Sequence, residues 1–109
     1  MELARRAVAC RHWRWMPGML AQPTRLRVTE TTGIGSGDYL PDLSDPATLG
    51  CLLALVREAW RDRFLVAQED YCHRALWCIR GRGAGMPDWL AVACMSEAEA
   101  LVAALEAAP

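Results

Sequence analysis

Cysteine and histidine are the residue types of this chain with the greatest capacity for chemistry. Cys10 lies two positions before His12, and Cys72 is followed directly by His73 and later by Cys78. Structural zinc sites usually take cysteines in pairs separated by about two to four residues, and the sequence contains no such pair. We therefore expect no bound metal, although a long-range site built from Cys10, His12, Cys72 and His73 stays open.

Nucleophilic catalysis by Cys72 would need an imidazole within hydrogen-bond reach and a third group that orients it. Adjacent residues at a strand end point to opposite sides, so His73 is badly placed for that role. The aspartates Asp38, Asp42 and Asp45 precede a predicted helix and fit turn and cap positions with local backbone partners. Because no set of residues in the sequence can be assigned the roles of general acid, general base and nucleophile at one site, we expect a protein that is not an enzyme.

Two glycine-rich segments, 33–37 and 81–85, have the composition of phosphate-binding loops. Such a loop leads directly into the N-terminus of a helix, and the P-loop also carries a lysine. The first segment leads instead to Asp38 and a proline at position 41, and the second leads to Met86 and Pro87. We interpret both segments as tight turns, so the sequence predicts no cofactor.

Arginine and tryptophan are favoured anchors of protein interfaces. All 12 basic residues are arginine, and five tryptophans occur in 109 residues. The stretch 12–20 combines tryptophan and methionine with a Pro-Gly turn, while a predicted hairpin and the loop after it carry arginines. We expect partner-binding residues at these two places, namely Trp13, Trp15, Met16, Arg74, Arg80 and Arg82. Core packing is the alternative interpretation of any single tryptophan.

Length and composition are those of an ordinary globular protein. With 109 residues, 53% of them hydrophobic and 23% charged, the sequence predicts a single domain over residues 1–109. The formal net charge of −1 supplies no overall field that would attract nucleic acid. No apolar run approaches the roughly 18 residues that span a bilayer, and the N-terminus lacks the apolar region of a signal peptide. Together with an odd number of cysteines, these features predict a soluble protein of a reducing cytoplasm.

The segment 40–60 predicts a capped amphipathic helix. Asp45 can accept hydrogen bonds from N–H groups of the first turn, and Pro46 fits the first helical position. Gly50 lies opposite the apolar face, which comprises Leu49, Leu52, Leu53, Val56 and Trp60. Further along, Ser96 and Glu99 fit the two positions of a capping box, so we expect a final helix from there to about Ala107.

Shorter patterns predict the remaining elements. Residues 2–10 have helical composition, and residues 24–32 alternate as a strand with one solvated face. Two β-prone runs at 64–68 and 74–80 predict a hairpin, and the apolar run 89–95 adds a third strand. The predicted order is α-β-α-β-β-β-α, an α+β domain whose small, largely antiparallel sheet is packed by helices.

Three blocks of the sequence carry a resemblance to a known group of proteins. They are residues 14–19 (RWMPGM), the segment 40–60, and residues 99–106 (EALVAALE). These blocks resemble small proteins encoded by bacteriophages and prophages of GC-rich bacteria, a group without an assigned activity. The resemblance implies an accessory phage protein, and such proteins often act by binding and blocking a host component.

We therefore expect a non-enzymatic phage accessory protein that binds a host or phage protein in the cytoplasm of a bacterial cell. An inhibitor of a host defence system, such as an anti-CRISPR protein, is the leading hypothesis. One alternative is a small nucleic-acid-binding module that uses the arginine-rich hairpin, and its binding would depend strongly on salt. Another is a self-associating structural phage component. The sequence does not specify the oligomeric state.

Overall fold

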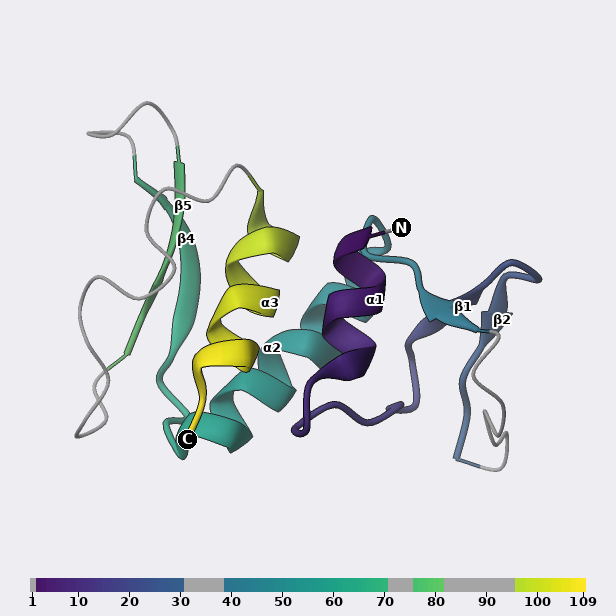
Figure 1. Ribbon diagram of the computed structural model, residues 1–109, viewed down its shortest axis with the longest axis horizontal. Coiled ribbons are helices and arrows are strands. Elements are labelled where there is room, and N and C mark those ends of the chain that lie inside the picture. Colours follow the sequence, from purple (N-terminus) through teal and green to yellow (C-terminus); the bar gives the residue numbers. More distant parts are fainter. Residues whose placement is uncertain (1, 31–38, 71–75, 82–95) are drawn as a thin grey trace.

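Three helices lie between two small antiparallel sheets in the residues that the computed structural model describes, 2–30, 39–70, 76–81 and 96–109 (Figure 1). Along the chain the elements are α1 (Glu2–Ala9), β1 (Leu20–Gln22), β2 (Leu26–Arg27), β3 (Leu40–Pro41), α2 (Pro46–Trp60), β4 (Val66–Asp70), β5 (Leu76–Arg80) and α3 (Glu97–Ala107). The strand order is β2-β1-β3 in the first sheet, and β4 pairs with β5 in the second. This architecture confirms the α+β fold class expected from the sequence.

Helix α3 is the centre of the core, because it contacts α1, α2 and both strands of the second sheet. Its side chains Leu101, Val102 and Leu105 have at most 1% of their surface exposed. The cap predicted at its start is confirmed, since Ser96 Oγ accepts a hydrogen bond from the Glu99 backbone N–H at 3.1 Å. Burial on several sides therefore holds this helix in place.

Helix α2 crosses α3 and supplies the other large part of the core (Figure 1). Its side chains Leu52, Leu55 and Val56 are almost completely buried. Near its end, the Trp60 indole Nε1 donates to the Ala104 carbonyl of α3 at 2.8 Å. The two helices are thus joined by apolar packing and by a hydrogen bond that satisfies a partly buried polar group.

The carboxylate of Asp45 caps α2, as predicted, and also joins this helix to the first sheet. It accepts from the Thr48 backbone N–H at 3.0 Å and from both Nη groups of Arg27 in β2, at 2.6 and 3.2 Å. The Thr48 hydroxyl donates to the same carboxylate and accepts from the Leu20 N–H of β1, each at 2.9 Å. Strands β1 and β2 are therefore attached to the first turn of α2.

The first sheet differs from the prediction. Of the strand predicted over 24–32, the described residues 24–30 form β2 at Leu26–Arg27 alone, and Arg25 directly before it adopts the left-handed backbone conformation (φ 56°) that interrupts a strand. Residues 31 and 32 lie outside the described part of the chain. Strands β1 and β3 are not predicted by the sequence patterns. Pro41 lies in β3 at the edge of the sheet, where the missing N–H of a proline is tolerated.

The predicted hairpin is confirmed, with a shift. Strands β4 and β5 pair in antiparallel register from Val66 with Arg80 to Asp70 with Leu76. Strand β4 begins two residues later than expected, and β5 lies within the expected run 74–80, of which residues 74 and 75 are outside the described part of the chain. The predicted third strand at 89–95 lies outside the described residues, as do the first glycine-rich segment and all of the second except Gly81. In the described part of the chain, none of the helices has the length and apolar character needed to cross a bilayer.

Gly50→Ala is expected to raise the free energy of unfolding. An added Cβ at this exposed helical position would meet no heavy atom within 4 Å. Alanine loses less backbone entropy than glycine in a helix, so the gain should be about 0.5–1 kcal/mol, measured by chemical denaturation. Gly18→Ala is the matched control and should lower stability, because Gly18 has a φ of 102° that L-residues rarely adopt. A loss of stability in Gly50→Ala would contradict this account of α2.

Asp45 is expected to make stability depend on pH. Hydrogen bonds from Arg27 and Thr48 lower the pKa of this carboxyl from 3.8 to about 2. The unfolded chain then binds more protons as the pH falls, so the stabilisation is complete above about pH 5 and is lost between about pH 5 and 2. Asp45→Asn retains a capping oxygen and removes the titrating group.

The measurement is chemical denaturation of the wild type and of Asp45→Asn across this pH range. Asp45→Asn should be clearly less stable at neutral pH, and the two proteins should converge as the pH approaches 2. Other carboxyls titrate in both proteins and cancel in the difference. A deficit of constant size at every pH would show that the charge of Asp45 does not contribute.

Candidate partner-binding groove

The predicted binding residues of the N-terminal stretch serve mainly to cover the core. Trp13, Trp15 and Met16 are partly buried and pack against the apolar cluster. The two indole rings meet edge to face, with their centroids 5.4 Å apart. Trp13 Nε1 is buried and has no hydrogen-bond partner among the described residues. These contacts favour the core-packing interpretation for all three side chains.

The predicted arginines of the hairpin are described only in part. Arg80 is exposed at the end of β5 and pairs directly with Val66, whose side chain is also exposed. Directly opposed residues of antiparallel strands lie on the same face, so these two side chains are neighbours. Arg74 and Arg82 lie outside the described residues.

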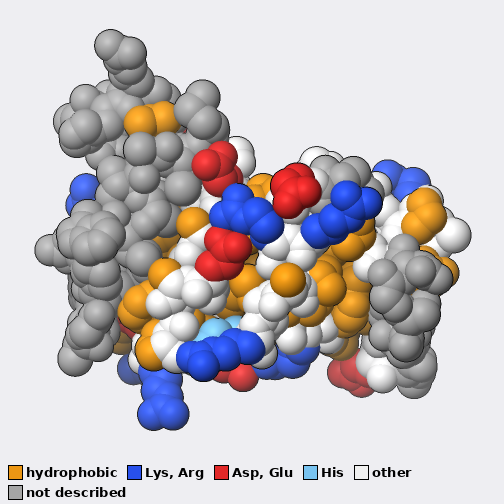
Figure 2. Space-filling model, viewed as in Figure 1, with side chains coloured by type: hydrophobic (Ala, Val, Ile, Leu, Met, Phe, Trp, Pro, Cys, Tyr) orange, Lys and Arg blue, Asp and Glu red, His pale blue; other side chains and the backbone are white. Residues whose placement is uncertain are grey.

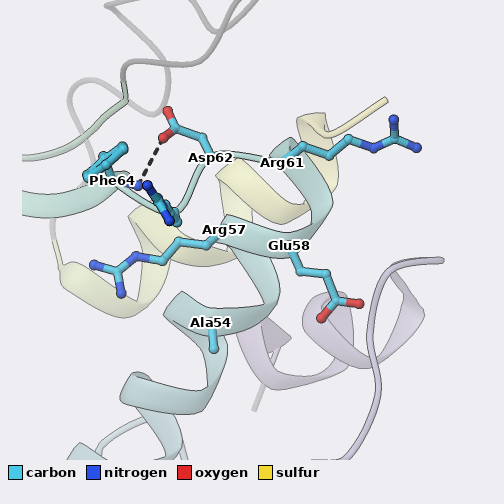
Figure 3. A pocket seen from close by; sticks show the side chains of 7 residues that line it. Ala54, Arg57, Glu58, Arg61, Asp62 and Phe64 are labelled. Atoms are coloured by element: carbon cyan, nitrogen blue, oxygen red, sulfur yellow. Dashed lines mark hydrogen bonds between the residues drawn. The ribbon is translucent and has the colours of Figure 1, made fainter.

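A groove opens where α2 ends and the chain turns towards β4 (Figure 3). It has a volume of about 710 Å³, and we call it the Arg57–Phe64 groove. Its lining consists of one small apolar residue, one aromatic residue and five charged residues: Ala54, Phe64, Arg57, Arg61, Arg63, Glu58 and Asp62. A groove of this volume is large enough for a few side chains of a partner.

The backbone at the end of α2 creates the groove. Arg61 adopts the left-handed conformation (φ 54°, ψ 39°), and its N–H donates to the last carbonyls of the helix. The Asp62 side chain is buried and accepts from the Phe64 N–H at 3.0 Å, which holds the next turn. As a result, Leu65 enters the core with no exposed surface, while Phe64 is 55% exposed.

The exposed Phe64 ring is in contact with the guanidinium group of Arg63. The guanidinium carbon of Arg63 lies 4.9 Å from the centroid of the Phe64 ring, a distance typical of a cation–π contact. Phe64 and Arg63 therefore present an aromatic ring and a guanidinium side by side in the lining of the groove.

A hydrogen bond to the backbone fixes the orientation of Arg57 in the groove. Its Nε donates to the Leu65 carbonyl at 2.8 Å, so the two Nη groups stay available for an anion. In Figure 3 the side chains of Arg57 and Phe64 extend to the same side, whereas Arg61 and Glu58 extend to the other. In the described part of the chain, ion pairs to carboxylates are made by other arginines and not by Arg57, Arg61 or Arg63.

The acidic residues of the groove already have partners. Glu58 forms an ion pair with Arg14 at 2.8 Å, and a hydrogen bond from Arg14 lowers the pKa of this carboxyl. Asp62 holds the turn that positions Phe64. Within the described residues, the groove therefore presents three arginines without carboxylate partners beside two carboxylates that are engaged within the protein.

A second cavity, of about 340 Å³, lies between α1 and α3 and contains Cys10 and His12. Burial raises the pKa of the Cys10 thiol, which donates to the Arg6 carbonyl at 3.3 Å. Burial therefore disfavours the thiolate form of Cys10. Among the described residues no group of three or more side chains could hold a metal ion, and Cys72 and His73 lie outside them.

The groove itself was not predicted from the sequence. The sequence patterns place Phe64 at the start of the β-prone run 64–68 and do not indicate whether its side chain is buried or exposed. The available signal was the arginine spacing at positions 57, 61 and 63, followed directly by the only phenylalanine of the chain. Comparisons with protein-family models, with curated proteins and with solved structures gave no match.

Substitution of Phe64 should have a much smaller effect on the free energy of unfolding than substitution of its neighbour Leu65. Phe64→Ala removes a largely exposed ring and should change the free energy of unfolding by no more than about 0.5 kcal/mol. Leu65→Ala empties a site in the core and should cost about 2–5 kcal/mol. Chemical denaturation of both variants provides the comparison. A cost for Phe64→Ala as large as that for Leu65→Ala would assign Phe64 to the core and not to a binding surface.

Proposed function

We propose that this protein acts by binding another protein through the Arg57–Phe64 groove and does not catalyse a reaction. The observation that carries the proposal is the exposed Phe64 ring, with Arg63 on it and Arg57 fixed beside it. Aromatic residues and arginine are enriched at protein interfaces, because they bury a large area and form several hydrogen bonds.

The biological setting of the proposal comes from the resemblance to phage-encoded proteins. In that setting the protein is an accessory phage protein in the bacterial cytoplasm, and its partner is a host or phage protein. An inhibitor of a host defence system, such as a CRISPR nuclease, can act by occupying a surface of its target without chemistry of its own. A small protein with one anchored aromatic and basic groove is suited to that mode of action.

Binding to nucleic acid is the second candidate, and the exposed Arg80 of the hairpin is the observation in its favour. Nonspecific nucleic-acid binding usually depends on many basic groups along one surface. On the face drawn in Figure 2, basic and acidic side chains are intermixed over the helices, so neither sign dominates. In addition, Arg63 covers one face of the Phe64 ring, which reduces its use for base stacking. These features favour a protein partner.

Affinity purification should separate the groove from the rest of the surface. The tagged wild type, expressed in a GC-rich bacterial host, should retain a partner in near-stoichiometric amount, identified by mass spectrometry. The double variant Arg63→Glu/Phe64→Ala should lose this partner, because both anchors are removed. Arg5→Glu makes the same charge change at an exposed position of α1 outside the groove and should retain it.

The same variants test the inhibitor form of the proposal. In a host with active CRISPR immunity, the wild type and Arg5→Glu should restore plating of a targeted phage, and the double variant should not. Retention of the partner by the double variant, at normal stability, would exclude the groove as the binding site. Turnover of a substrate by the purified protein would contradict a non-enzymatic role.

A further inference from the structure

The charge of the groove indicates the chemistry of the segment that it binds. Arg57, Arg61 and Arg63 line the groove without carboxylate partners in the described part of the chain. The two acidic side chains of the groove are engaged by Arg14 and by the turn before Phe64. An anionic partner can therefore compensate the arginines without displacing an ion pair of the protein.

The geometry of Arg57 favours a carboxylate as the anion. Its Nε is fixed on the Leu65 carbonyl, so the two Nη groups form a preorganised pair of donors. A carboxylate matches such a pair with two parallel hydrogen bonds, and preorganisation reduces the entropy lost on binding. Arg63 is held differently, by its contact with Phe64, and can meet a second carboxylate while it stays on the ring.

Phe64 adds a requirement for an apolar contact. More than half of its side chain is exposed, and Ala54 supplies a further apolar part of the lining. Transfer of such a surface out of water is favourable only when an apolar group covers it. A segment with carboxylates alone would leave Phe64 in water, so the groove matches a segment that carries both kinds of side chain.

We propose that the Arg57–Phe64 groove binds a short acidic peptide segment with one large apolar side chain. Carboxylates of the segment pair with Arg57 and Arg63, and the apolar side chain packs against Phe64. This inference rests on the proposed function, since it names the chemistry of the partner that the groove takes. It predicts binding that weakens with salt, because exposed ion pairs are screened.

Fluorescence anisotropy with labelled synthetic peptides tests the inference on the full chain. The probe is a peptide of alternating glutamate and aspartate around a central leucine. Two matched peptides replace the acidic residues by glutamine and asparagine, or the leucine by serine. Each replacement should weaken binding by about tenfold or more, because one of the two kinds of contact is lost. Equal binding of the neutral peptide would overturn the inference.

Variants of the protein locate the site. Arg63→Glu should weaken binding of the acidic peptide by about tenfold or more and should gain affinity for a lysine-substituted peptide. Arg5→Glu should leave the affinity for the acidic peptide unchanged. Thermal denaturation establishes that both variants are folded, which is expected for exposed positions. An equal effect of the two variants would show a general response to net charge and would overturn the inference.

Two further measurements identify other occupants. Tighter binding of a single-stranded oligonucleotide than of the acidic peptide would overturn the inference in favour of nucleic acid. Sedimentation that shows a dimer abolished by Arg63→Glu would overturn it in favour of a second copy of the chain. If the groove variants lose the captured partner but the peptides do not bind, the proposed function stands and the acidic chemistry of the partner is wrong.

Discussion

The arrangement of the first half of the molecule depends on the hydrogen bonds that the Asp45 carboxylate accepts. This carboxylate receives hydrogen bonds from the first turn of α2, from the Thr48 hydroxyl and from both Nη groups of Arg27. Strands of two or three residues have too few ladder bonds and too little buried surface to persist alone. The first sheet is therefore ordered because it is attached to the start of a buried helix. The same helix ends at the groove, so one rigid element links the two regions.

The helices could be predicted from the sequence because their signals are local. A short polar residue at each cap and a periodic apolar face are sufficient, and the caps at Asp45 and Ser96 are observed where they were expected. The strands of the first sheet could not be found in this way. A strand of two residues is too short to show the alternation of apolar and polar side chains by which strands are recognised. In addition, β1 pairs with β3, whose residues are far from it in the sequence. Strand positions in the second sheet were correct to within two residues because those strands are longer.

The candidate site was harder to predict than the fold, and the reason is a backbone conformation. The sequence left open whether Trp13 is buried or exposed and gave no signal for the exposure of Phe64; the structure packs Trp13 against the core and leaves Phe64 exposed. The left-handed Arg61 and the buried Asp62 decide which of two adjacent apolar residues enters the core. Nothing in the alternation of apolar residues distinguishes Phe64 from Leu65. None of the sequence-predicted residues within the described part of the chain lines the groove.

The central position of α3 has a consequence for the order in which the molecule can form. This helix covers α1, α2 and the second sheet, and its Glu106 pairs with Arg6 across 100 positions of the chain. Contacts of that separation form late, because closure of a long segment costs entropy before the contacts compensate for it. During synthesis the apolar faces of the earlier elements thus leave the ribosome before residues 97–107 can cover them. That interval is when the nascent chain is most susceptible to aggregation and most dependent on chaperones.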